Sequence, residues 1–182
     1  RQSAGLAVAE QLSHFAKYGL PDDPDDGIAM SEYFVETLVA DDDDANLGNG
    51  TPNGAAIIAA FNAHGIGTGF FMDIVHAPLA DQPGAGPYPV TATATYNGPF
   101  GALAGSPTLH YSINNGAYQS AATTPTGNPD EYTASIPGAN GAVVSYYIST
   151  TDTYGEGITD PASAPTAGAH RFLAGPATTL AN

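Results

Sequence analysis

The sequence predicts an α+β fold in which a short helical segment of three helices precedes an all-β sandwich of about seven strands. Apolar residues recur at helical spacing through roughly the first third of the chain. After a Gly/Thr-rich hinge at residues 65–69 the spacing changes to every second residue, as in β-strands. We therefore expect a helical segment at 1–68, a sandwich at 69–175 and a tail at 176–182.

The first two helices are expected on either side of an acidic turn. Apolar side chains share one face over residues 2–18, and Gly19 and Pro21 follow as a stop signal. The turn at 21–27 supplies carboxylates to the N-terminus of a second helix, which ends near Ala40. We interpret these turn acids as solvated helix-start residues: Asp22, Asp23, Asp25 and Asp26.

The third helix is expected to begin with Thr51 as its N-cap and Pro52 at its first position. It buries Ile57, Ile58 and Phe61, and it should end before Gly65, a residue typical of helix C-termini.

Seven runs rich in β-branched and aromatic residues follow, separated by Gly, Pro and Asn turns. Asn114, Asn115 and Gly116 fit a hairpin turn between two of these runs. The runs begin at Phe71, Tyr88, Pro107, Gly116, Glu131, Ala142 and Ala169. About seven short strands are the number expected of an immunoglobulin-like or fibronectin-type sandwich.

The charge balance excludes two classes of partner. The chain has 18 Asp and Glu against 3 Lys and Arg, a formal net charge of −15. Nucleic acid and anionic membrane surfaces require basic patches, so we expect no nucleic-acid partner. No window reaches the roughly 18 uninterrupted apolar residues of a membrane helix, so no membrane insertion is expected. The composition, with 22 Gly, 15 Pro and many Ala and Thr, favours a secreted, extracellular or cell-surface protein.

The sequence contains no familiar catalytic motif. There is no HExxH pair, no GxSxG elbow and no phosphate-binding loop. The five histidines lie far apart along the chain: His14, His64, His76, His110 and His170. We therefore expect this chain by itself to be no enzyme.

The acid run that begins at Asp41 is the candidate metal site. Asp42, Asp44 and Asn46 alternate as in the opening of a calcium loop, and calcium prefers oxygen ligands. Leu47 stands where an EF-hand requires Gly, so an EF-hand is excluded. A calcium loop of another geometry and a solvated loop both remain open. Secondary ligands would be Asp41, Asp43 and Asn49.

Five tyrosines of the β half allow two interpretations. They could line a face that binds sugar or a protein partner. Alternating strand residues of this kind also pack in cores and across strands. The five are Tyr111, Tyr118, Tyr132, Tyr146 and Tyr147.

The segment DDDDANLGNGTPNGAAIIAAFNAHGI, residues 41–66, resembles the end of the catalytic domain of secreted bacterial metallopeptidases related to thermolysin and fungalysin. In that family an acidic loop and an N-G-T-P-N type cap lead into a helix that ends A-F-x-x-H-G. The β half resembles the immunoglobulin-like domain that often follows such peptidases. The stretches that carry this second resemblance are YSINNGAY, EYTASIPG, VVSYYISTTDTYG and AHRFLAG.

This resemblance implies that residues 2–66 form the helical C-terminal lobe of a peptidase-like unit, with the acidic loop bordering its cleft. The family's zinc-binding helix would lie before Arg1, so no zinc is expected in this chain. The family's oxyanion-stabilising histidine has no counterpart between Asn49 and Asn53.

Three functions are compatible with these observations. The first is a non-catalytic C-terminal portion of a secreted peptidase-like protein, acting as an extracellular binding, adhesion or secretion-associated module. The second is a self-assembling extracellular filament subunit, and the third is the processed half of an active zinc metallopeptidase. The expected partners are a protein or glycan at the cell surface, or copies of the chain itself, and the expected ion is calcium.

Overall fold

The computed structural model of the protein describes residues 2–20 and 29–175. The chain divides into two compact units. A helical unit runs to Phe71 and also includes Asn97–Ala102, and a β unit comprises Met72–Tyr96 and the chain from Leu103 onward. The predicted tail and the acidic turn at 21–27 lie outside the described residues.

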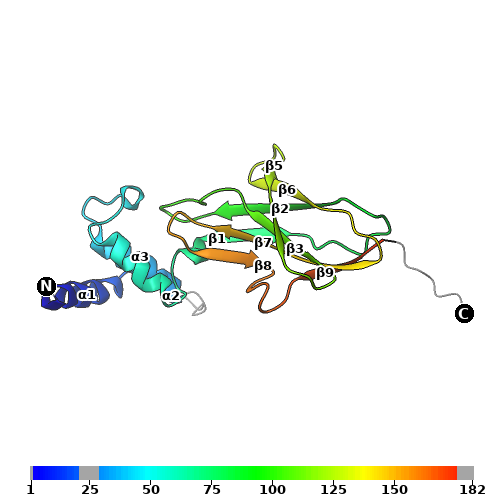
Figure 1. Ribbon diagram of the computed structural model, residues 1–182. Helices are drawn as coiled ribbons and strands as arrows, with labels where there is room; N and C mark the ends of the chain where they lie inside the picture. The colour runs from blue at the N-terminus through cyan, green and yellow to red at the C-terminus, as the bar shows by residue number, and fades with distance from the viewer. Residues whose placement is uncertain (1, 21–28, 176–182) are drawn as a thin grey trace, which may run out of the picture. The chain divides into compact units, whose positions relative to one another are not determined.

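The helical unit contains the three predicted α-helices (Figure 1). They are α1 (Gln2–Ala16), α2 (Ala29–Asp41) and α3 (Gly54–Asn62). Two short 3₁₀ turns, η2 (Leu47–Asn49) and η3 (Thr68–Phe71), complete the unit. None of the described helices combines the length and apolar character that a membrane span requires.

Aromatic side chains form the centre of the helical unit. Phe34 of α2 is completely buried, and its ring centroid lies 5.0 Å from that of Phe61 and 6.2 Å from that of Phe100. Phe71 contacts Phe100 at 5.6 Å. Buried aromatic rings contribute large apolar areas to a core. Phe100, far away in the sequence, is therefore an integral part of this core.

The start of α3 differs from the prediction. Thr51 is not the N-cap, because α3 begins at Gly54 and its N-cap position is Asn53. The hydroxyl of Thr51 instead donates to Asp41 Oδ2 at 2.7 Å. The Thr51 hydroxyl is thus hydrogen-bonded to a carboxylate at the end of α2 and does not cap α3. The helix starts later, at Gly54.

The β unit consists of two antiparallel sheets (Figure 1). One has the order β1-β2-β6-β5, and the other has the order β4-β3-β7-β8, with β9 also paired to β7. The strands are β1 (Met72–His76), β2 (Tyr88–Tyr96), β3 (Thr108–Ile113), β4 (Gln119–Ala122), β5 (Thr124–Pro125), β6 (Glu131–Ile136), β7 (Ala142–Thr151), β8 (Gly157–Asp160) and β9 (His170–Ala174).

The described strands number nine, so the prediction of about seven is wrong. All seven predicted runs form strands, and β5 and β8 are the two additions. β5 has two residues, one of them proline, and β8 has four. Segments this short show little of the alternation by which a strand is recognised, and β4, also of four residues, was predicted with the help of the hairpin turn before it.

The alternating pattern places one face of each sheet in the core. In β2, Tyr88, Val90 and Ala94 are buried. In β7, Tyr146 and Ile148 are buried between the sheets. The strand period of two therefore sets which residues face inward.

The hairpin between β3 and β4 forms at the predicted residues. Asn114 and Asn115 have φ values of 51° and 58°, and Gly116 N–H donates to the Ile113 carbonyl at 3.0 Å. Two successive positive φ values are the requirement of a type I′ turn, which asparagine tolerates better than most residues.

Candidate functional site

Asp41, the first acid of the loop, has a structural role. It is 9% exposed at the end of α2. Its Oδ2 accepts hydrogen bonds from the Thr51 hydroxyl at 2.7 Å and the Asn53 N–H at 2.6 Å. Its Oδ1 accepts from Asn53 Nδ2 at 2.7 Å. Asp41 therefore ties the end of α2 to the start of α3.

The next three acids form the candidate metal cluster. One carboxylate oxygen each from Asp42, Asp43 and Asp44 lies within 4.8 Å of the others. Asp42 is half-buried, whereas Asp43 and Asp44 are exposed. Asp42 Oδ1 is shielded from solvent and has no hydrogen-bond partner among the described residues. The structure thus groups the predicted Asp42 and Asp44 with Asp43.

The remaining predicted ligands already have partners within the loop. Asn46 Oδ1 accepts from the Gly48 N–H at 3.2 Å. The two oxygens of Asp44 accept from the Asn46 N–H at 3.0 Å and from Asn49 Nδ2 at 2.7 Å. The three carboxylates fit calcium in kind, but the ion takes about six to eight oxygens. Further oxygens would have to come from water or main-chain carbonyls.

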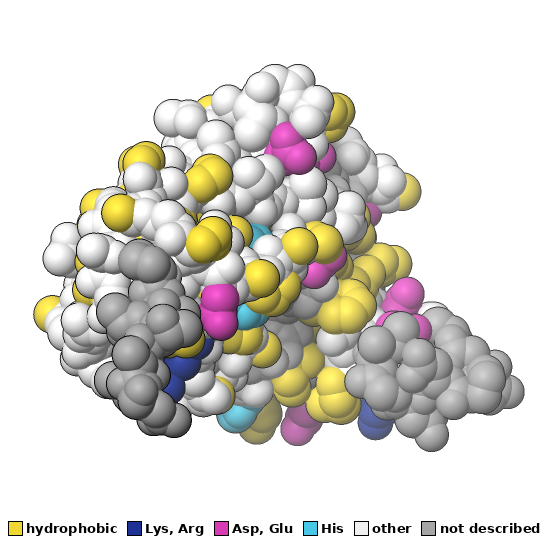
Figure 2. Space-filling view, turned by 90° about the vertical axis from the view of Figure 1, so that its right-hand side faces the viewer, with side chains coloured by type: hydrophobic (Ala, Val, Ile, Leu, Met, Phe, Trp, Pro, Cys, Tyr) yellow, Lys and Arg dark blue, Asp and Glu magenta, His cyan; other side chains and the backbone are white. Residues whose placement is uncertain are grey.

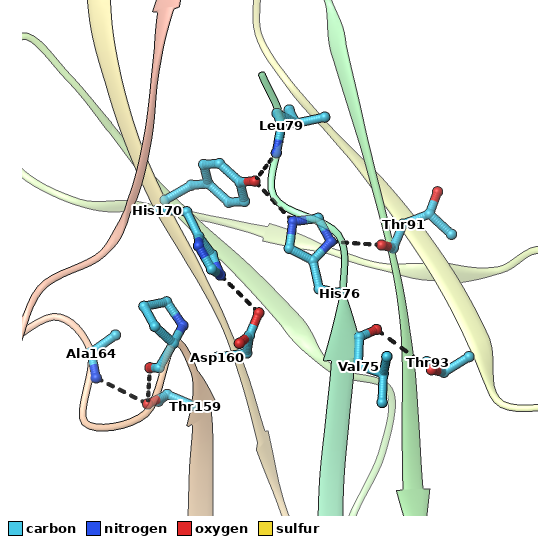
Figure 3. Close-up of polar contacts among 11 residues, drawn as sticks. Val75, His76, Leu79, Thr91, Thr93, Thr159, Asp160, Ala164 and His170 are labelled. Atoms are coloured by element: carbon cyan, nitrogen blue, oxygen red, sulfur yellow. Dashed lines mark hydrogen bonds and ion pairs between the residues drawn. The ribbon is translucent and has the colours of Figure 1, made fainter. Parts of the chain in front are cut away.

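A polar cluster that the sequence did not predict joins the two sheets (Figure 3). His76 of β1 contacts the Thr91 carbonyl through Nδ1 and the Tyr146 hydroxyl through Nε2, both at 2.8 Å. The Leu79 N–H also donates to that hydroxyl at 2.8 Å. A carbonyl only accepts, so Nδ1 carries the proton of neutral His76. Tyr146 therefore donates to Nε2 while it accepts from Leu79.

His170 of β9 extends this cluster. Its Nε2 lies 2.8 Å from Asp160 Oδ2 of β8. Its ring centroid lies 5.4 Å from that of His76 and 5.3 Å from that of Tyr146. Burial raises the pKa of Tyr146, the Leu79 N–H opposes this rise, and the charge of Asp160 adds to it. Four titratable side chains from β1, β7, β8 and β9 thus lie together.

The geometry of this cluster favours a structural role over catalysis. Tyr146 is completely buried, and its hydroxyl both accepts and donates within the cluster. Among the described residues, only Asp42, Asp43 and Asp44 bring three metal-ligating side chains within 4.8 Å of one another. His76 and His170 therefore do not share a ready-made ion site with Asp160. The cluster instead links β1 of one sheet to β7 of the other.

A second histidine environment lies on the other side of the β3–β7 sheet. His110 Nδ1 lies 2.9 Å from Ser120 Oγ, and His110 Nε2 lies 2.9 Å from Ser149 Oγ. Its ring stacks on Tyr147 with centroids 4.4 Å apart and an interplanar angle of 11°. Burial lowers the pKa of His110. Burial therefore favours a neutral imidazole between the two hydroxyls.

The five candidate tyrosines divide between the two interpretations. Tyr111 and Tyr146 belong to the core, with 7% and 0% exposure. Tyr118 is 39% exposed, and Tyr132 and Tyr147 are half-buried. Spacing in the sequence could not separate these groups, because strand pairing decides which side each residue faces.

Asp152 is a buried acid at the end of β7. It is 2% exposed, and its Oδ1 accepts from the N–H groups of Tyr154 and Glu156, both at 2.9 Å. Its Oδ2 has no hydrogen-bond partner among the described residues. Burial, followed by the charge of Asp152 and the influence of Tyr154, raises the pKa of Tyr96 to about 12.

Comparison with known proteins identifies no relative. No protein-family model matches the sequence, and no curated protein matches it.

Proposed function

We propose that the chain is the non-catalytic C-terminal portion of a secreted peptidase-like protein and that its sandwich, of immunoglobulin type, is an extracellular binding or adhesion module. The contrast between the two units carries this proposal. The β unit encloses its own core, including the completely buried Tyr146 and Ile136. Of the described large apolar side chains that are exposed, seven lie in the helical unit, among them Leu6 at 60% and Phe15 at 52%, and four lie in the larger β unit.

An apolar groove in the helical unit supports the first part of the proposal. It has a volume of about 600 Å³ and is lined by residues of α1, α2 and α3, including Val8, Leu12, Tyr33, Ile57 and Phe61. Concentrated apolar surface of this kind marks an interaction site. A preceding peptidase-like part of the same protein is the occupant that the proposal assigns to this groove.

The sandwich architecture supports the second part. Two antiparallel sheets pack around one core, as in immunoglobulin-like domains that serve as extracellular binding modules. The chain has only 3 Lys and Arg residues, and their dark-blue side chains are sparse on the face drawn in Figure 2. The resulting net charge of −15 favours partners other than polyanions.

The acidic loop takes the role of a calcium loop in this proposal. The close approach of Asp42, Asp43 and Asp44 supports this role, because neighbouring carboxylates repel one another without a cation. The buried, unpartnered Oδ1 of Asp42 gives further support.

Self-assembly into a filament is less favoured than a binding module. Filament formation by strand pairing needs an open sheet edge. The edge strands of the two sheets have two to five residues: β5 has two, β4 and β8 have four, and β1 and β9 have five. Such short edges offer few main-chain groups to a second copy.

Binding to whole cells tests the proposal. The purified chain, fluorescently labelled, should bind washed cells of its source organism saturably, and it should not cleave casein. A labelled acidic protein without a β-sandwich is the control. Absence of saturable binding would contradict the module, and casein cleavage abolished by a zinc chelator would contradict the non-catalytic assignment.

A further inference from the structure

We propose that the outer face of the β4-β3-β7 strands binds a neutral polysaccharide. We call this surface the tyrosine face and define it by Tyr118, Ser120, His110, Tyr147 and Ser149. The inference rests on the proposed function as an extracellular binding module and names the class of ligand for it.

Strand register places His110, Ser120, Tyr147 and Ser149 on one side of the sheet, and Tyr118, just before β4, joins them through its contact with Tyr147. His110 of β3 lies opposite Ser120 of β4 and Tyr147 of β7. Its neighbours in the strand, Leu109 and Tyr111, are buried in the core. Side chains alternate between the two faces of a strand, so His110 and its cross-strand partners face outward.

The aromatic rings of the tyrosine face support one another. The His110 ring stacks on Tyr147 at 4.4 Å, and the Tyr118 ring meets Tyr147 edge to face at 5.2 Å. Tyr118 is 39% exposed. An aromatic ring that is held by its neighbours and open to solvent offers apolar surface at a low cost in side-chain entropy. Tyr118 is therefore the ring on which the C–H face of a sugar can stack.

Hydroxyl groups lie beside the His110 ring of the same face. Ser120 Oγ and Ser149 Oγ lie 2.9 Å from the two nitrogens of His110. A neutral imidazole has one donor and one acceptor, so one serine donates to the ring and the other accepts from it. The accepting serine keeps its own O–H for an outside acceptor, and both oxygens retain acceptor capacity. An apolar ring beside hydroxyl groups matches the mixed surface of a saccharide.

The charge of this face selects a neutral ligand. The strands of the sheet contain one acid, Asp160, which pairs with the inward-facing Ile148. They also contain one Lys or Arg, Arg171, whose Nε and Nη2 donate to Ser145 Oγ at 3.2 Å and to Asn115 Oδ1 at 3.3 Å. A cationic ligand therefore meets no carboxylate from the described strands of this face, and the net charge of −15 repels polyanions.

A saccharide also fits better than a protein partner. The cores of protein interfaces are apolar, and their hot spots are surrounded by contacts that exclude water. On the described strands of this sheet, the one large apolar residue that is exposed is Leu173 of β9. It pairs with Val143 at the start of β7, whereas Tyr147 lies further along that strand. Next to Tyr118 lies Tyr147, whose other neighbour, His110, contacts two serine hydroxyls.

Affinity electrophoresis of the whole chain tests this inference. Native gels would contain hydroxyethyl cellulose, soluble starch or mannan, with a polysaccharide-free gel as the reference. We expect at least one polysaccharide to retard the chain. Tyr118→Ala should weaken that binding by about tenfold or more, whereas Tyr118→Phe should retain it. The matched control is Tyr18→Ala, which removes a tyrosine that is 77% exposed in the helical unit.

Each outcome decides the inference. Retardation that depends on Tyr118 supports it, with circular dichroism used to verify that the variant is folded. Absence of retardation in all three gels overturns it, as does retardation that Tyr118→Ala leaves unchanged. If the gels show no binding while whole cells still bind the chain through Tyr118, the face takes a protein partner. In that case the polysaccharide inference fails and the binding module stands.

Discussion

His76 and Tyr146 join the two sheets of the β unit through a 2.8 Å hydrogen bond. His76 belongs to β1 of one sheet, and Tyr146 belongs to β7 of the other. The Tyr146 hydroxyl also accepts from the Leu79 N–H, so it satisfies two polar groups at once. Replacement of the hydroxyl leaves both groups without their partner.

Tyr146→Phe is therefore expected to lower the free energy of unfolding by about 1–3 kcal/mol, the usual cost of leaving polar groups without partners in a protein interior. Urea denaturation of the whole chain measures this change. The matched control is Tyr118→Phe, which removes the hydroxyl of an exposed tyrosine and should change stability little. Equal stability of Tyr146→Phe and the unmodified chain would contradict the assigned role.

His110 is expected to make stability fall in acid. Burial lowers its pKa, so below the ordinary histidine value of about 6.5 the unfolded chain binds more protons than the folded chain. The free energy of unfolding should therefore decrease as the pH falls through that value. His110→Gln should lose less stability over the same pH interval, as measured by urea denaturation at several pH values. An equal pH dependence in His110→Gln would refute this expectation, and His14→Gln is the control in the helical unit.

Asp41→Ala should destabilise the helical unit. The substitution removes three hydrogen bonds to Thr51 and Asn53 and separates the end of α2 from the start of α3. Hydrogen bonds to a charged group contribute about 1.5–3 kcal/mol each, so a loss of at least about 2 kcal/mol is expected. Hydrogen exchange of α2 and α3 amides would report the loss. Asp43→Asn, at an exposed neighbour, should leave exchange unchanged.

Calcium is expected to raise the melting temperature if the acidic loop binds it, because an ion that binds only the folded state stabilises that state. Asp42→Asn should weaken the effect, since it removes a carboxylate of the cluster. Differential scanning calorimetry with calcium, and with magnesium at equal ionic strength, makes the measurement. A melting temperature that does not change on addition of calcium would identify a solvated loop.

Tyr96 should titrate near pH 12 in the folded chain. Its raised pKa means that the folded chain keeps a proton that the unfolded chain releases near pH 10, so this stabilisation is complete below pH 10 and is lost as the pH rises towards 12. Asp152→Asn removes one cause of the shift and should lower the pKa of Tyr96, while burial keeps it above 10. Phenolate absorbance, with Tyr96→Phe to assign the signal, tests this. If Tyr96 has the same pKa in Asp152→Asn as in the unmodified chain, the charge of Asp152 is ruled out as a cause of the shift.

The sequence contained most of the fold and less of the candidate sites. Helical spacing located α1, α2 and α3, alternation located six strands, and the hairpin turn at Asn114 and Asn115 helped to locate β4. The predicted N-cap of α3, Thr51, is wrong, because its hydroxyl donates a hydrogen bond to Asp41. The cluster of His76, Tyr146 and His170 was missed, because its members lie far apart in sequence and meet only through strand pairing. Alternation alone does not state which strands are neighbours.

Phe100 has a consequence for the order in which the chain can fold during synthesis. The segment Asn97–Ala102 belongs to the helical unit although β1 and β2 precede it in the sequence. The N-terminal helices therefore cannot complete their aromatic core when they leave the ribosome. They must wait until the first two strands of the β unit have been made, so the last contact of the helical unit depends on the beginning of the β unit.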